Sequence, residues 1–159
     1  MTERIPHIIV HAGFHRTGTT SVQVFLDQNA EALSPHIQVL RRRDFQALAQ
    51  STRRYTLGRF RPVQRWRLVR DLRKTLARIT PDHRPILLSW EGFSGTVPGW
   101  GKVTDYRTAA PLAGRIAREL TRRFGAKARI TFAYSTRDPA AWRKSAHAHL
   151  IKYLSLIHI

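Results

Sequence analysis

The chain has no cysteine, few acidic residues and no long apolar run among its 159 residues. Without cysteine it forms neither disulfide bonds nor thiolate metal sites, although this absence says little about the cellular compartment. No apolar run approaches the roughly 20 residues that cross a bilayer, and the N-terminal segment lacks the small-residue cleavage site of a signal peptide. We therefore expect no transmembrane segment, and a location in the cytoplasm or, as a second option, at the periphery of a membrane.

The shortage of acidic residues leaves a large positive charge, because the chain has 28 lysines and arginines but only 10 aspartates and glutamates, for a net charge of +18. Such a field attracts polyanions, whether nucleic acid, anionic lipid or an acidic small molecule. Only five of the 28 basic residues are lysine, and an arginine excess of this kind can equally reflect a GC-rich genome. Charge alone therefore does not identify a partner.

Apolar runs and helical periodicity alternate along the chain. The expected strands are residues 8–11, 37–40, 85–90 and 128–137, and the third is a continuous apolar run typical of a strand buried on both faces. The expected helices are residues 19–33, one or two basic helices within 43–79 with an interruption near 58–62, residues 108–124, and a helix that begins at Pro139. Residues 91–103, rich in Gly and Pro, are expected to form a loop.

This alternation predicts an α/β protein with a mainly parallel, P-loop-like sheet flanked by helices. The length suits one domain with a substantial core, which we assign to residues 1–153. In such sheets ligands bind beyond the carboxyl ends of the strands. The loops that begin at Gly13, Glu91 and Ser135 are therefore the expected location of a site.

The last six residues are "LSLIHI". The DNA at the end of a common transposase sequencing adapter encodes these same six residues. We therefore interpret residues 154–159 as an adapter-derived tail and exclude them from the fold. On this interpretation, residues 1–153 are the N-terminal part of a longer, C-terminally truncated domain.

The stretch "HAGFHRTGTT" follows the first expected strand and has the composition of a phosphate-binding loop. Glycine allows a tight path between strand and helix, so that backbone N–H groups and the helix N-terminus point at one anion. Arg16 adds a guanidinium fork, and three threonines supply hydroxyls. The alternative is an ordinary strand-to-helix turn with threonine caps. The predicted phosphate-binding residues are Gly13, Phe14, His15, Arg16, Thr17, Gly18, Thr19 and Thr20.

This loop closely resembles the 5′-phosphosulfate loop of sulfotransferases, especially bacterial carbohydrate-type enzymes, whose pattern runs H-x-G-x-x-K-T-G-T-T-S-x-Q. These enzymes transfer a sulfuryl group from 3′-phosphoadenosine-5′-phosphosulfate (PAPS). The resemblance implies PAPS as the donor and a hydroxyl acceptor, on a saccharide or glycoconjugate. The family carries lysine where this chain has Arg16.

A second segment resembles the same family. Sulfotransferases bind the donor's 3′-phosphate with an arginine at the end of a strand and a serine eight residues later on the next helix. "ITFAYSTRDPAAWRKSAHAHLIKY" supplies Arg137 and Ser145 at that spacing. "ILLSWEGFSG" also resembles the family's middle strand, which often ends in a Ser–Glu pair. The resemblance implies that Arg137 and Ser145 bind the 3′-phosphate.

Sulfuryl transfer needs a group that neutralises the leaving phosphate and a base that accepts the acceptor's proton. Arg16 and the loop amides are candidates for the first role. Glu91, at the carboxyl end of a buried strand, is the first candidate for the second role. His15 lies inside the loop and is instead a candidate to contact the sulfuryl group. His11 is interpreted as a packed or hydrogen-bonded histidine. We predict no metal site, because this chemistry requires none.

Two other functions fit parts of the sequence. A P-loop kinase or NTPase would need lysine at the position of Thr19 and usually a strand-end aspartate, where only Glu91 stands. A nucleic-acid-binding domain would combine the positive charge with aromatic side chains, and Tyr55, Phe60 and Trp66 lie among basic residues. A nucleic-acid-binding function does not explain why two segments resemble the PAPS-binding motifs of sulfotransferases and occur in the same order along the chain. We therefore expect no specific nucleic-acid partner.

Overall fold

The computed structural model describes residues 5–58 and 62–155, with side chains described as far as residue 152. It contains a sheet of four strands, all parallel, in the order β2-β3-β1-β4. The strands are β1 (His7–His11), β2 (Gln38–Leu40), β3 (Ile86–Ser89) and β4 (Arg129–Ala133). The prediction of an α/β fold with a parallel sheet flanked by helices is therefore confirmed.

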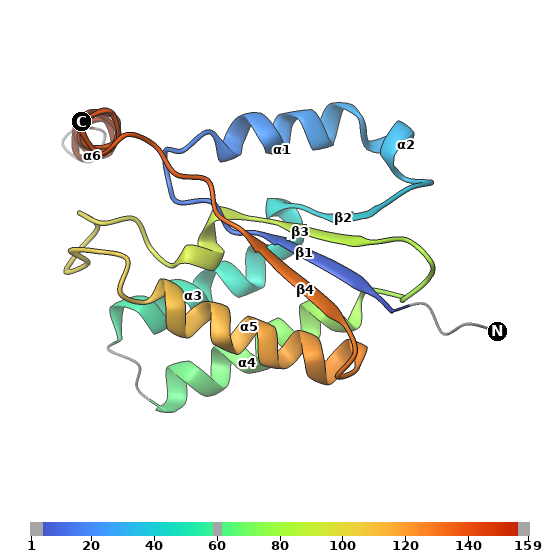
Figure 1. Cartoon of the computed structure of the whole chain (residues 1–159). Coiled ribbons are helices and arrows are strands. Elements are labelled where there is room, and N and C mark those ends of the chain that lie inside the picture. The colour runs from blue at the N-terminus through green and yellow to red at the C-terminus, as the bar shows by residue number, and fades with distance from the viewer. Residues whose placement is uncertain (1–4, 59–61, 156–159) are drawn as a thin grey trace.

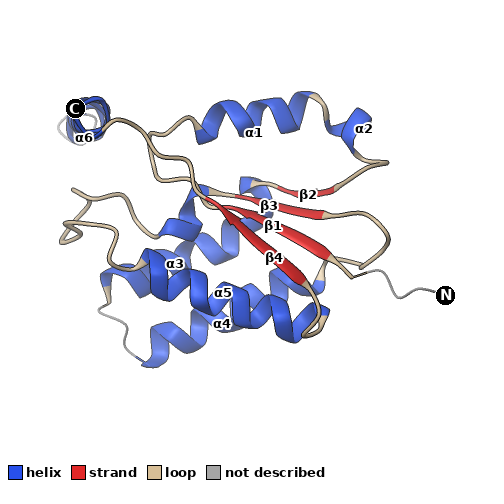
Figure 2. Ribbon diagram, viewed as in Figure 1, coloured by secondary structure: helices blue, strands red, loops and turns tan. Residues whose placement is uncertain are grey.

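Helices cover the two faces of this sheet unequally (Figure 1). One face, here called the α1 face, carries α1 (Thr19–Gln28) and the single turn α2 (Ala30–Leu33). The other, here called the α5 face, carries α3 (Gln46–Leu57), α4 (Pro62–Ala77) and α5 (Ala109–Phe124). The last helix, α6 (Pro139–Ser155), lies beyond the carboxyl ends of the strands and near the start of α1 (Figure 2). Short 3-10 helices, η1 (Arg42–Phe45) and η2 (Glu91–Ser94), follow β2 and β3.

The hydrophobic core is concentrated where the sheet meets the three helices of the α5 face. Strand residues two apart point to the same side of a sheet, and Ile8 and Val10 of β1 are fully buried beside Ile86 and Leu88 of β3. In α5 the buried apolar residues recur every fourth position. The helix residues in this core include Leu48, Tyr55, Leu68, Leu72, Leu76, Leu112, Ile116 and Leu120. Burial of this continuous apolar surface supplies the main driving force for the fold.

Several predicted boundaries were wrong. The helix expected over residues 19–33 breaks at Asn29, whose backbone N–H and side-chain amide both donate to the Phe25 carbonyl at 3.0 and 2.9 Å. The loop expected from Glu91 begins with the 3-10 helix η2. The strand expected over residues 128–137 ends at Ala133 and is partly exposed, because it is a sheet edge that pairs only with β1.

One or two helices were expected in the basic segment 43–79. The structure has two, α3 and α4, after the 3-10 helix η1. Phe60, one of the interleaved aromatic residues, lies outside the described residues, as do residues 156–159 of the expected tail. The helix α6 continues through the start of that tail to Ser155. Within the described part of the chain, no helix is long and apolar enough to cross a membrane.

Candidate functional site

The glycine-rich loop lies at the carboxyl end of β1, between its neighbours β3 and β4. From β1 the chain passes to the α1 face, whereas from β3 it passes through η2 toward α5 on the opposite face (Figure 1). Adjacent strands whose connections leave toward opposite faces create a crevice at their carboxyl ends, where α/β proteins bind ligands. The topology therefore places the predicted loop at the position in the sheet best suited to a ligand.

The backbone of the loop requires two of its glycines. A Cβ atom on Gly13 would lie 2.4 Å from Cγ2 of Thr19, so a side chain at position 13 would displace the start of α1. Gly18, immediately before α1, has a φ of +91°, in the left-handed region that glycine adopts without strain. Arg16 is the only non-glycine residue in the described part of the chain with positive φ, at +68°. Such strained conformations persist where the surrounding contacts impose them, and they cluster at functional sites.

Helix α1 starts without a side-chain cap. Gly18 occupies the N-cap position, and no side-chain hydrogen bond caps the helix. The hydroxyl of Thr17 donates instead to the Phe14 carbonyl at 2.6 Å, and Thr19 is buried. The threonine caps expected for an ordinary strand-to-helix turn are therefore not formed. Among the described residues, no group accepts a hydrogen bond from the backbone N–H of Thr19 or Thr20, so both donors are available to an anion.

The two segments predicted to bind one donor meet in space. The Nε of Arg16 donates to Oγ of Ser145 over 3.1 Å, although 129 positions separate the two residues in the chain. Arg137 lies in the segment that joins β4 to α6, where its side chain is exposed and makes no hydrogen bond or ion pair with a described residue. Asp138 caps α6 by accepting from the Ala141 N–H at 2.8 Å.

His15 is held by two aromatic residues that sequence analysis did not identify. Its backbone N–H donates to the Tyr106 hydroxyl at 3.2 Å, and its Nδ1 lies 3.2 Å from the same oxygen. The indole N–H of Trp142 in α6 donates to the His15 carbonyl at 2.8 Å. Tyr106 also packs against Phe14, with 4.6 Å between the ring centroids. Nothing in the local pattern around Tyr106 indicates this contact, because the residue lies in an irregular segment between β3 and α5.

Glu91 lies close enough to His11 of β1 and His15 of the loop to act on both electrostatically. The Glu91 carboxylate accepts from Nε2 of Gln23 in α1 at 2.8 Å. Burial lowers the pKa of both His11 and His15, and the negative charge of Glu91 opposes that shift in part. His11 is hydrogen-bonded to Ser89 at 2.9 Å and to Ser135 at 3.3 Å, which confirms its interpretation as a hydrogen-bonded histidine.

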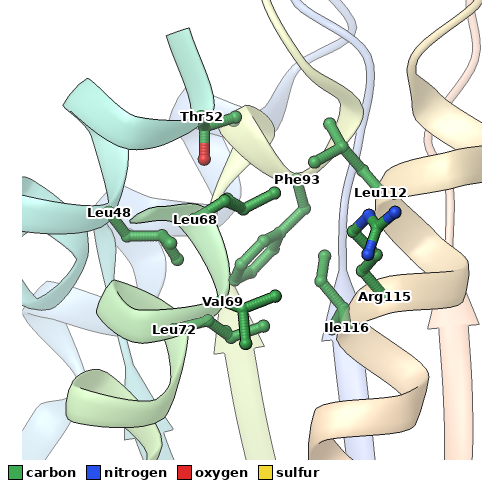
Figure 3. Close-up of a pocket in the computed structure, with 10 residues that line it drawn as sticks. Leu48, Thr52, Leu68, Val69, Leu72, Phe93, Leu112, Arg115 and Ile116 are labelled. Atoms are coloured by element: carbon green, nitrogen blue, oxygen red, sulfur yellow. The ribbon is translucent and has the colours of Figure 1, made fainter. Parts of the chain in front are cut away.

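A small cavity in the apolar core is not part of this site. It lies between α3, α4 and α5, where side chains such as Leu48, Leu72, Phe93 and Ile116 point toward one another (Figure 3). Its volume of about 10 Å³ is close to the minimum that holds one water molecule. It is a small packing defect of the apolar core.

Comparisons with protein-family models, with curated proteins and with solved structures found no match for this chain. Within the described residues, no group of three or more His, Asp or Glu side chains is arranged to hold a metal ion.

Proposed function

We propose that the chain is the donor-binding part of a PAPS-dependent sulfotransferase with a P-loop-like fold. The observation that carries the proposal is the hydrogen bond between Arg16 and Ser145, because it joins the two segments that separately resemble the donor-binding motifs of that family. The uncapped N–H groups at the start of α1 add donors for the 5′-phosphosulfate. The acceptor is a hydroxyl group, on a saccharide or glycoconjugate, and the reaction takes place in the cytoplasm.

In this proposal the loop binds one end of the donor, and the segment from Arg137 into α6 binds the other. The loop amides and Arg16 bind the 5′-phosphosulfate, where they stabilise the charge that develops on the leaving phosphate. Arg137, whose guanidinium has no partner among the described residues, binds the 3′-phosphate with Ser145. When PAPS binds, it breaks the hydrogen bond between Arg16 and Ser145. Arg16 then contacts the 5′-phosphosulfate and Ser145 contacts the 3′-phosphate.

The reaction transfers the sulfuryl group in one displacement. The acceptor oxygen forms a bond to sulfur while the bond from sulfur to the phosphate oxygen breaks, and its electron pair leaves with adenosine 3′,5′-bisphosphate. The acceptor's proton passes to a base. Glu91 is the base in this proposal, because its carboxylate lies at the carboxyl end of β3 and is oriented by Gln23.

In this proposal His15 is a hydrogen-bond donor to the sulfuryl group, whereas Glu91 is the base. Burial raises the pKa of Tyr106 to about 12, so its phenol keeps its proton. Among the described residues, Nδ1 of His15 is the one acceptor within reach of that proton. Nδ1 then accepts, and Nε2 of the neutral ring carries the hydrogen. A neutral Nε2–H donates to a sulfuryl oxygen and does not serve as the base.

Isothermal titration calorimetry tests donor recognition. We expect adenosine 3′,5′-bisphosphate to bind more tightly than ATP or single-stranded DNA. The variant R137A should weaken bisphosphate binding by about tenfold or more, but leave binding of adenosine 5′-monophosphate nearly unchanged, because that ligand lacks the 3′-phosphate.

A matched control is R129A, which removes an exposed arginine from the start of β4, at the other end of the strand. It should weaken neither ligand appreciably. Tighter binding of ATP than of the bisphosphate would contradict the proposal. An equal loss for bisphosphate and monophosphate in R137A would contradict the role of Arg137.

A further inference from the structure

A second concentration of positive charge lies between α3 and α4, apart from the glycine-rich loop. These two helices pack against each other on the α5 face, whereas the loop leads into α1 on the opposite face (Figure 1). Between them is a cleft of about 280 Å³ with a mainly polar lining. We call it the arginine cleft, and its lining residues are Ala47, Gln50, Ser51 and Arg54 from α3 and Arg67, Arg70 and Asp71 from α4.

The spacing of these residues explains why they converge. In α3 they occur at positions i, i+3, i+4 and i+7, and in α4 at i, i+3 and i+4, which is one face of a helix in each case. Two such faces in contact bring three arginines to one cleft. The apolar contacts of α3 and α4 with the core fix the helices in this arrangement.

The charges in the arginine cleft do not cancel. Asp71 is 9% exposed, and its Oδ1 is contacted by Arg70 through Nε at 2.8 Å and Nη2 at 2.7 Å. This pair accounts for one arginine. Arg54 and Arg67 are exposed, and neither side chain makes a hydrogen bond or ion pair with a described residue. Five other arginines do have acidic partners within the described chain: Arg41, Arg73, Arg84, Arg107 and Arg122.

We propose that the arginine cleft is a binding site for a phosphate or sulfate ester on a small molecule. The guanidinium groups of Arg54 and Arg67, which have no acidic partner among the described residues, repel each other. An oxyanion between them removes that repulsion while accepting paired hydrogen bonds. A volume near 280 Å³ is just below the usual range of about 300–1,000 Å³ for small-molecule sites. It therefore accommodates a sugar-sized group, and it is a local cleft, unlike the extended groove that tracks a nucleic-acid strand.

Trp66 provides a second element beside the cleft. Its side chain is 61% exposed, one turn before Arg70, and the Arg70 guanidinium lies over its ring at 5.2 Å from the centroid. The pair Trp66–Arg70 gives an aromatic surface at the edge of the cleft, on which the body of the ligand packs while its charged ester enters between Arg54 and Arg67. The proposal does not depend on the sulfotransferase proposal, because it uses no residue of the glycine-rich loop or of α6.

Calorimetry with four probes tests the site on the full chain: inorganic phosphate, inorganic sulfate, glucose 6-phosphate and glucose 6-sulfate. We expect both esters to bind more tightly than the inorganic ions, and the two esters distinguish a phosphate source from a sulfate source. The double variant R54Q/R67Q should weaken the tighter ester by about tenfold or more. The control R118Q/R129Q removes the same charge from α5 and β4, and should change binding less than twofold.

The variant D71N gives a result that unfolding cannot imitate. It removes the carboxylate that competes for Arg70, so binding of the ester should become tighter, by up to about fivefold. Three outcomes would overturn the proposal. These are no binding of any probe, an equal loss in the two double variants, or binding of a short oligothymidylate that depends on Arg54 and Arg67 when the esters do not bind. None of the variants touches the donor site, so binding of adenosine 3′,5′-bisphosphate reports separately on the proposed function.

Discussion

The two faces of the sheet differ in what their helices bury. On the α5 face, α5 buries Leu112, Ile116 and Leu120 against the sheet. On the α1 face, Leu26 is the one apolar residue of α1 that is buried, and Phe25 is 56% exposed. The loop with the strained Arg16 leads into this second, weakly packed face. The stable core and the candidate site are therefore separated: the apolar packing lies on one face, and backbone donors without a partner among the described residues lie at the edge of the other.

The sharpest test of this difference is to truncate one phenylalanine on each face. Phe93 is 2% exposed and contacts Phe45 and Trp90, with ring centroids 5.0 and 5.2 Å apart. F93A should lower the free energy of unfolding by about 3–5 kcal/mol. F25A, on α1, should change it by no more than about 0.5 kcal/mol. Chemical denaturation of both variants measures the difference, and equal losses would show that α1 contributes to the core as strongly as η2 does.

A second test adds one methyl group to a glycine of each region. G13A places Cβ against Thr19, so we expect a loss of stability of about 1–3 kcal/mol and weaker binding of adenosine 3′,5′-bisphosphate. In G114A, on α5, the nearest atom to the new Cβ is Arg118 Nη2 at 4.0 Å. This control should be neutral or stabilising by up to about 1 kcal/mol, because alanine favours helix. Thermal unfolding and calorimetry measure both effects, and unchanged ligand binding in G13A would separate the loop from the ligand.

A third test removes one hydroxyl from the site. Y106F deletes the partner of the His15 backbone N–H and of its Nδ1, which should cost about 0.5–1.5 kcal/mol of stability. It should also release the His15 tautomer, which ¹⁵N chemical shifts of the imidazole detect. The control Y134F alters a ring 5.5 Å from Phe14 that makes no hydrogen bond to His15. An Nε2–H tautomer that persists in Y106F would contradict the role assigned to Tyr106.

The smallest expected effect is the pH dependence that His11 contributes. Burial lowers its pKa in the folded protein from the ordinary value of 6.5, so the unfolded chain binds the proton more readily. Stability from this group is therefore present above pH 6.5 and is lost as the pH falls from there through the folded pKa. The Tm of the wild type should decrease over that range, and the decrease should be smaller in H11N. An identical pH profile in H11N would assign the effect to other groups.

Much of the fold follows from local patterns in the sequence. Alternation of apolar strands with amphipathic helices predicted the parallel sheet, and Gly13 and Gly18 predicted the tight path after β1. The break at Asn29 was missed, because the apolar spacing of residues 19–33 continues through it and only the backbone geometry shows the interruption. The early end of β4 was missed for a related reason, since strand composition does not indicate how far a neighbouring strand extends.

The presence and order of the strands and helices follow from the sequence alone, because these elements depend on residues two to four positions apart. Which distant side chains meet depends instead on how the strands and helices pack. The partners of His15 and Arg16 lie 91 and 129 positions away, at Tyr106 and Ser145. The convergence of Arg54 and Arg67 likewise depends on how α3 packs against α4. Strand order and helix packing set the contacts at such separations. Burial of apolar residues drives that packing, and it does not depend on which polar side chains are brought together.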